Sequence, residues 1–309
     1  MLSTLLIKKL QVRVGLATLT LLILSILSFS PVVKAANEFY ALAVEGYGDP
    51  SEYPYECSET RTIYCWDTLD GVFEIFDVDW SWSYTDYDYT PHSGQFVDDD
   101  CHTWGYDDDS NLGLDHADVG FWCTHGSATC VDEIPLHFSS ILPGMKTSGG
   151  SCQVLAEGRY GLHDLELGSG GANGDMDILM ADSCHFLQDC VWWTGAISNV
   201  MQTAGNMTVI LGYHGGVHDS STHSNDIVDA VDASRYNGIG DNWIDYTNHI
   251  WSGWGNDDCA VVALSCDTAQ QCEDILLYGG FEDRADPGDH SHSGYYYVED
   301  CHPHLGDPL

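Results

Sequence analysis

The sequence predicts an α/β domain with a mainly parallel β-sheet and helices on both faces of the sheet. Short apolar runs of strand length recur along the chain, segments with helical periodicity separate the later runs, and 44% of the 309 residues are hydrophobic. A strand, helix, strand order implies right-handed crossovers, which make neighbouring strands parallel and cover the sheet with helices. The length suits a single domain over residues 37–309.

The first 36 residues have the pattern of a signal peptide. Basic residues at positions 8, 9 and 13 precede an uncharged run over residues 14–29, and the small residue Ala35 stands before the expected cleavage point. Cleavage there would leave a chain that begins near Asn37, so we expect a secreted protein, extracellular or periplasmic, without stable membrane association. A retained membrane anchor is the alternative, because the apolar run approaches the ~18 residues of a short transmembrane helix.

Acidic residues dominate the charge. The chain holds nine basic and 48 acidic residues, and four of the basic ones precede Asn37, so residues 37–309 carry a formal charge of −43. Such a surface repels nucleic acid and anionic lipid, which excludes both as partners. It suits a halophilic environment, where salt screens self-repulsion, or divalent cations that neutralise clustered carboxylates.

The 12 cysteines all follow the signal segment. In an oxidising compartment an even count allows up to six disulfides, although the pairing does not follow from the sequence. No CxxC pair occurs, which argues against a zinc-ribbon site. The candidate pairs that lie close in sequence are Cys57 with Cys65, Cys184 with Cys190, and two among Cys259, Cys266 and Cys272.

The elements follow from periodicity. Runs of strand length predict six strands, and apolar residues at helical spacing predict three helices between the last three of them. The expected strands cover residues 39–44, 72–78, 119–123, 178–181, 209–212 and 259–264. The expected helices cover residues 191–203, 225–233 and 243–251.

Two segments depart from this pattern. Residues 79–118 carry Asp clusters at positions 98–100 and 107–109, between aromatic and glycine residues, and predict an irregular, solvated insertion. Its oxygens could hold Ca²⁺, but EF-hand spacing is absent, so we expect no required cofactor. Residues 282–309 predict a solvated C-terminal tail with a histidine cluster, namely His290, His292, His302 and His304.

Two of the apolar runs end in reactive side chains. The run from Val119 ends in His125 and Gly126, and the run from Ile178 ends in Ser183 and Cys184. Because ligands bind at the carboxyl ends of parallel strands, we expect the imidazole and the thiol to face one crevice. A thiol beside an imidazole can act as a nucleophile, and the backbone N–H groups of Gly126 and Cys184 could form an oxyanion hole.

These motifs resemble the caspase-like cysteine peptidases, the superfamily of caspases, legumain, clostripain and gingipains. The matching pieces are residues 121–127, with His125-Gly126, and residues 178–184, with Ser183-Cys184. The resemblance implies a caspase-like fold over roughly residues 39–277 and a secreted hydrolase of the cysteine endopeptidase class. It also implies that His125 is the general acid/base, that Cys184 is the nucleophile, and that the substrates are proteins or peptides. The later strands look like a branch of secreted, caspase-like bacterial proteins.

The main alternative to a cysteine peptidase depends on how the cysteines pair. A free Cys184 leaves 11 other cysteines, so at least one more must be unpaired, whereas a bond from Cys184 to Cys190 would remove the nucleophile. The protein would then be a non-catalytic, disulfide-stabilised extracellular binding or surface protein of the same fold. The 58 residues between His125 and Cys184 imply an insertion that contains Cys152 and His163.

A second histidine cluster follows the run over residues 209–212. His214 and His218, with Asp219 or His223, could ligate a transition metal and would make the protein a metallohydrolase. The Gly-Gly pair between the two histidines breaks the helical geometry that zinc motifs of the HExxH type require. We therefore expect a pocket-lining loop here rather than a metal site.

Overall fold

The computed structural model describes twelve stretches of the chain. They are residues 38–44, 62–77, 82–87, 117–126, 136–137, 139–146, 152–156, 176–184, 186–189, 207–249, 258–281 and 292–297. The predicted signal segment and both Asp clusters of the predicted insertion lie outside these residues. Within the described stretches, no helix is both long enough and apolar enough to cross a membrane.

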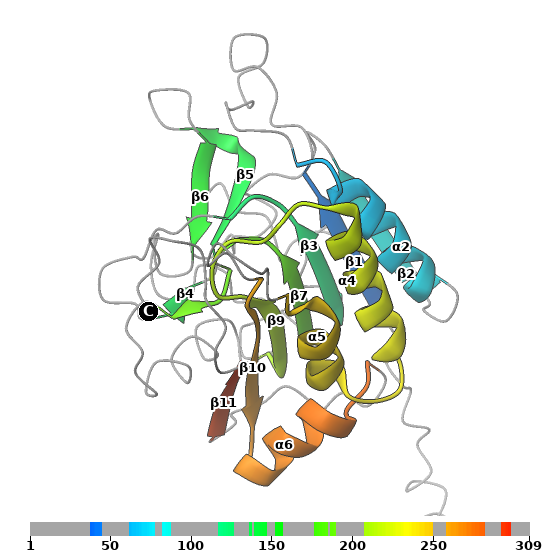
Figure 1. The fold of residues 1–309 in the computed structure, drawn as a ribbon, viewed down its shortest axis with the longest axis vertical. Coiled ribbons are helices and arrows are strands. Elements are labelled where there is room, and N and C mark those ends of the chain that lie inside the picture. The colour runs from blue at the N-terminus through cyan, green and yellow to red at the C-terminus, as the bar shows by residue number, and fades with distance from the viewer. Residues whose placement is uncertain are drawn as a thin grey trace, which may run out of the picture. The chain divides into compact units, whose positions relative to one another are not determined.

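A seven-stranded sheet forms the centre of the fold (Figure 1). In sheet order its strands are β11 (His292–Tyr297), β10 (Ala260–Cys266), β9 (Val209–Tyr213), β7 (Ile178–Asp182), β3 (Val119–Cys123), β1 (Glu38–Ala43) and β2 (Trp82–Tyr87). The five strands from β9 to β2 are parallel, and β10 and β11 are antiparallel to their neighbours. The predicted α/β class and the mainly parallel sheet are confirmed.

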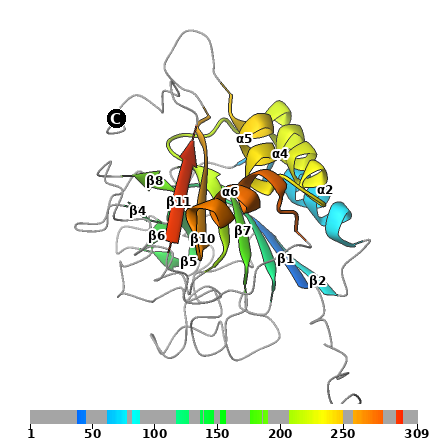
Figure 2. The ribbon, with the colours of Figure 1, turned by 90° about the horizontal axis from the view of Figure 1, so that it is seen from below.

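The four described helices lie on one face of this sheet. They are α2 (Cys65–Asp77), α4 (Ser221–Ala233), α5 (Ile239–Thr247) and α6 (Ala269–Tyr278). All four contribute to the cluster that packs on alternate strand residues such as Phe39, Phe121 and Met180. Figures 1 and 2 show α2, α4 and α5 on the same side of the strands. Coverage of both faces by helices was predicted partly from residues 191–203, which lie outside the described residues, so the described helices confirm the prediction for one face only.

Both faces of the central strands are nonetheless buried. Every residue of β3, β7, β9 and β10 is buried, which explains why these segments read as continuous apolar runs rather than alternating ones. On the face away from the helices, Trp122 packs edge-on against Phe186 with ring centroids 5.6 Å apart. The strand ends that carry His125 and Cys184 are therefore fixed from both sides.

Three of the expected elements differ in the structure. The predicted strand at 72–78 is the second half of α2, because Cys65, Leu69, Val72 and Phe76 are buried at helical spacing. The predicted irregular insertion begins with an ordered edge strand, β2, which pairs with β1. The predicted solvated tail contains β11, where His292 is aligned with Cys266 of β10, so this histidine belongs to the sheet.

Short antiparallel pairs occupy part of the predicted insertion between His125 and Cys184. One pair joins β5 (Ser139–Lys146) to β6 (Cys152–Ala156), and the other joins β4 (Leu136–His137) to β8 (Gln188–Asp189), just after Cys184. Cys152 opens β6, while His163 lies outside the described residues. The chain that separates the two expected catalytic residues therefore includes strands outside the main sheet.

Two disulfides are described. Cys266 pairs with Cys272, which confirms one of the close pairs expected there. Cys65 pairs with Cys123 rather than with Cys57, because α2 packs across β3 and brings its first turn to the end of that strand. Cys184 is free, so the pairing with Cys190 is wrong.

The two disulfides predict different losses of stability. Cys65–Cys123 closes a separation of 58 residues and Cys266–Cys272 a separation of 6. Because a cross-link stabilises mainly by restricting the unfolded chain, we expect a Cys65→Ser/Cys123→Ser variant to lose about 4 kcal/mol and a Cys266→Ser/Cys272→Ser variant about 2 kcal/mol. Urea unfolding of both variants measures the difference, and equal losses would contradict it.

Candidate active site

A pocket lies at the carboxyl ends of the neighbouring parallel strands β3 and β7. Its volume is about 90 Å³, and its walls come from the start of α2, the two strand ends and the loop after β9. His125 and Cys184 both line it, as expected for the edge of a parallel sheet. The remaining lining residues are Thr62, Cys65, Cys123, Thr124, Asp182, Ser183, Val217 and Asp219.

Gly126 packs directly against the backbone of Cys184. A Cβ placed on Gly126 would overlap the carbonyl group of Cys184 and would come within 2.7 Å of its backbone nitrogen. Such an approach between two backbones is open only to glycine. The glycine after His125 therefore allows the two strand ends to approach each other closely.

Cys184 is a half-buried thiol with backbone partners. The N–H of Val217 donates to its Sγ at 3.2 Å, and the carbonyl oxygen of Val217 lies 3.8 Å from the same atom. Burial raises the pKa of Cys184 to about 11, Asp182 and Asp258 add to the rise, and hydrogen bonds from the backbone of Val217 and Gly126 oppose it. In the free protein Cys184 is therefore a neutral thiol near pH 7.

This protonation state predicts slow alkylation. We expect iodoacetamide to modify Cys184 roughly 10- to 100-fold more slowly at neutral pH than it modifies an unstructured cysteine peptide, with a rate that still climbs above about pH 9. The reason is that the thiolate is the attacking species. Mass-spectrometric kinetics on the folded protein measure the rate. Alkylation as fast as that of the peptide would show that the thiolate is already formed.

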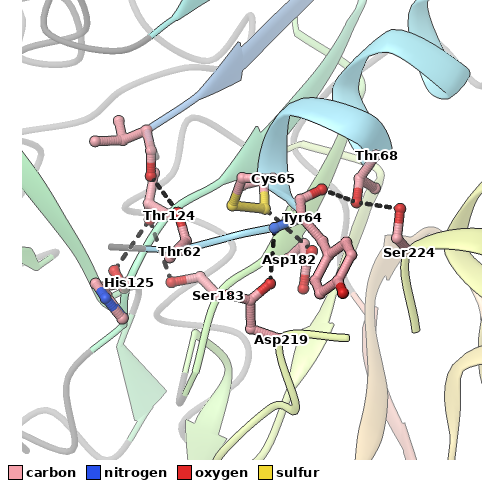
Figure 3. The surroundings of a disulfide bond; sticks show 12 residues. Thr62, Tyr64, Cys65, Thr68, Thr124, His125, Asp182, Ser183, Asp219 and Ser224 are labelled. Atoms are coloured by element: carbon pink, nitrogen blue, oxygen red, sulfur yellow. Dashed lines mark hydrogen bonds between the residues drawn. A yellow bond between two sulfur atoms is a disulfide. The ribbon is translucent and has the colours of Figure 1, made fainter. Parts of the chain in front are cut away.

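His125 lines the same pocket and is partly exposed, and Figure 3 shows it beside Thr124. The Thr124 hydroxyl donates to the carbonyl oxygen of His125 at 3.0 Å and lies 3.4 Å from the Ser183 hydroxyl, so this threonine joins the two strand ends. The end of β3, just before His125, is thus connected through these two hydroxyls to the end of β7, just before Cys184. The imidazole itself extends beyond the buried strand.

The opposite wall is built around the first turn of α2. The carboxylate of Asp219 accepts hydrogen bonds from the backbone N–H groups of Ile63 and Tyr64, at 2.5 and 3.0 Å (Figure 3). The Cys65–Cys123 disulfide adds a covalent link between this turn and β3. A carboxylate is favourable beside unpaired N–H groups at the start of a helix. Asp219 therefore stabilises the start of α2 and also adds a negative charge to this wall of the pocket.

Asp182 places a second carboxylate in the pocket. It ends β7 two residues before Cys184, and one of its oxygens lies 3.1 Å from Sγ of Cys123. That sulfur is in a disulfide and carries no proton, so this contact is no hydrogen bond. The other oxygen lies 3.0 Å from Nε2 of His223. None of the described residues that line the pocket is a lysine or an arginine, so these residues give its walls negative charge.

The histidines that were weighed as metal ligands have other partners. Nδ1 of His218 lies 2.7 Å from Asp258, and His214 is buried with its backbone N–H bonded to the carbonyl oxygen of Cys259. Within the described residues, three metal-type donors come together only at Cys65, Cys123 and Asp182. Because the first two are joined as a disulfide, their sulfurs are not available as thiolate ligands.

Comparisons with protein-family models, curated proteins and solved structures give no match for this chain. The proposed function therefore depends on the residues that line this pocket and on their contacts.

Three acidic or histidine side chains at or beside the pocket were not predicted from the sequence as part of the site. Asp182 was visible as the last strand residue before Ser183-Cys184 but had no assigned role, and His223 was considered only as a metal ligand. Asp258 had no signal, since it is one acidic residue among many. These three come from β7, from α4 and from the segment just before β10, so only the folded sheet brings them together.

Proposed function

We propose that this protein is an exported cysteine endopeptidase of the caspase-like type, with Cys184 as nucleophile and His125 as general acid/base. The observation that carries the proposal is the free thiol of Cys184 in one pocket with His125, at the ends of adjacent parallel strands. Support also comes from Gly126, which packs directly against the Cys184 backbone, so that the backbone N–H groups of these two residues are the candidates for an oxyanion hole.

The chemistry follows from a neutral thiol. Sγ of Cys184 attacks the scissile carbonyl carbon while its proton passes to the imidazole of His125. The N–H groups of Gly126 and Cys184 stabilise the oxyanion, and the C–N bond breaks as His125 gives the proton to the leaving amine. Water, deprotonated by His125, then hydrolyses the thioester, which releases the acid product and restores the thiol.

The pocket favours a basic substrate side chain. Asp182 and Asp219 line it, and a guanidinium or ammonium group would meet one or both carboxylates in a partly desolvated space. We therefore propose cleavage after arginine or lysine. The Cys65–Cys123 disulfide and the methyl groups of Thr62 and Val217 offer an apolar surface to the stem of such a side chain.

Substrate specificity tests this function. Fluorogenic peptides that differ only in arginine, citrulline or aspartate before the scissile bond are offered to the purified protein under mild reductant. We expect turnover of the arginine peptide, and a fall of about 100-fold in its kcat/KM for Asp182→Asn, because a desolvated charge pair is lost. The exposed-site variant Asp241→Asn changes the same charge away from the pocket and should leave kcat/KM unchanged.

The alternative function, a non-catalytic binding protein, predicts a different result. A binding protein would bind a peptide or protein tightly and would cleave none of the three substrates. Equal cleavage of arginine and citrulline peptides would instead keep the peptidase and reject the basic specificity.

A further inference from the structure

His223 lies between two carboxylates beneath the pocket. Its Nε2 is 3.0 Å from Oδ1 of Asp182, and its Nδ1 is 3.7 Å from Oδ2 of Asp258. The imidazole is 3% exposed and Asp258 is fully buried. The N-cap of α4 fixes the position of the histidine, because the Ser220 hydroxyl accepts a hydrogen bond from the backbone N–H of His223.

The two carboxylates determine which form of the imidazole fits. A neutral ring has one N–H and one lone pair, so it would turn a lone pair toward Asp182 or toward Asp258. Only the imidazolium, with a proton on each nitrogen, directs an N–H at both carboxylates: it donates a hydrogen bond to Asp182 at 3.0 Å and forms an ion pair with Asp258, whose 3.7 Å separation is too long for a hydrogen bond. Asp258 is held as an acceptor, since the backbone N–H of His218 donates to its Oδ1 at 2.9 Å and Nδ1 of His218 lies 2.7 Å from the same oxygen.

The other groups around His223 agree with a cation. Asp226 lies one turn further along α4, Tyr213 of β9 packs at a ring distance of 5.4 Å, and His249, after α5, lies 6.4 Å away with its Nε2 on Asp226. Burial alone would lower the pKa of His223, but Asp182, through its charge and hydrogen bond, outweighs this effect together with Asp258 and Asp226, and the pKa is raised.

We propose that His223 is a buried imidazolium that positions the Asp182 carboxylate for recognition of a basic side chain in the pocket. This inference rests on the proposed basic specificity, and it adds the residue that maintains that specificity. Without the imidazolium, Asp182 would lose its partner at 3.0 Å, whereas Asp258 would keep its contacts with the backbone N–H and the ring of His218. The Asp182 carboxylate would then no longer be held in position, and the pocket would discriminate less between arginine and a neutral side chain.

Binding measured without turnover tests this role. In a Cys184→Ala background, calorimetry gives the dissociation constants of an arginine peptide and of its citrulline counterpart. We expect His223→Asn to lower the preference for arginine about tenfold near pH 7, because Asp182 loses the cation that orients it. The matched variant His249→Asn removes a neighbouring His–Asp pair and should leave the preference unchanged. A preference that His223→Asn does not alter at any pH would overturn the proposal.

Nuclear magnetic resonance of the ring nitrogens gives a second, activity-independent measurement. Both nitrogens of His223 should be protonated near pH 7, and Asp182→Asn should shift the titration to lower pH because the main anionic partner is removed. A neutral His223 near pH 7 would overturn the proposal even if arginine peptides are cleaved. A failure of cleavage with discrimination in binding intact would reject the peptidase and leave the role of His223 in place.

Discussion

Replacement of Cys184 by alanine is expected to lower kcat for an arginine peptide by about 10⁴-fold or more. The thiol supplies the only atom that forms the acyl-enzyme bond in this scheme, so its removal leaves no covalent route. Folding should be nearly unaffected, because the side chain is small and half-buried and makes no disulfide. Single-turnover cleavage assays and urea unfolding of the same preparation measure the two effects.

A matched control separates loss of the nucleophile from loss of any cysteine. The Cys266→Ser/Cys272→Ser variant removes a disulfide at the far end of β10, whose Ala260 end aligns with the carboxyl end of β9. We expect this control to be less stable but to keep kcat. Unchanged cleavage by Cys184→Ala would remove Cys184 from the mechanism and require another nucleophile.

Gly126→Ala is the second substitution with a large expected effect. The new Cβ would overlap the Cys184 backbone, and a backbone cannot rotate away as a flexible side chain can. The strand ends would have to separate, which moves His125, Cys184 and both N–H groups of the oxyanion hole. We expect kcat/KM to fall by about 10³-fold and the free energy of unfolding by about 3 kcal/mol. Peptide cleavage and urea unfolding measure these losses.

Gly120→Ala on the same strand is the control for this substitution. Its Cβ would lie 2.9 Å from the terminal methyl group of Met176, a flexible group that can turn aside. We expect this variant to lose about 1 kcal/mol or less of stability and to retain the activity. If both glycine variants behave alike, the contact between Gly126 and Cys184 has no special role in the site.

The strands that carry the site were predictable because their burial is continuous. The run over 119–123 coincides with β3, and the runs at 178–181 and 209–212 fall within β7 and β9. Helix α2 was misread because a short apolar run does not distinguish a buried strand from the buried side of a helix. Strands β2 and β11 were missed, since they lie in acidic or histidine-rich segments and are held by partners distant in sequence.

The site was predictable only in part, for a related reason. His125 and Cys184 each follow an apolar strand directly, so their meeting at one sheet edge follows from parallel pairing. The approach of Asp258 to His223 depends on β10 running antiparallel to β9, which aligns Ala260 with Tyr213. No local pattern specifies that register, and the Cys65–Cys123 bond likewise depends on how α2 crosses β3.

Covalent labelling of the native protein tests the central claim most directly. The folded, non-reduced protein is treated with an arginyl chloromethyl ketone, digested, and mapped by mass spectrometry. We predict an adduct on Cys184 that citrulline analogues form far more slowly in the folded protein, and we expect unfolding in urea to abolish this preference for the arginyl reagent. Recovery of Cys184 in a disulfide, or a folded protein in which Cys184 stays unlabelled, would contradict its role as the nucleophile.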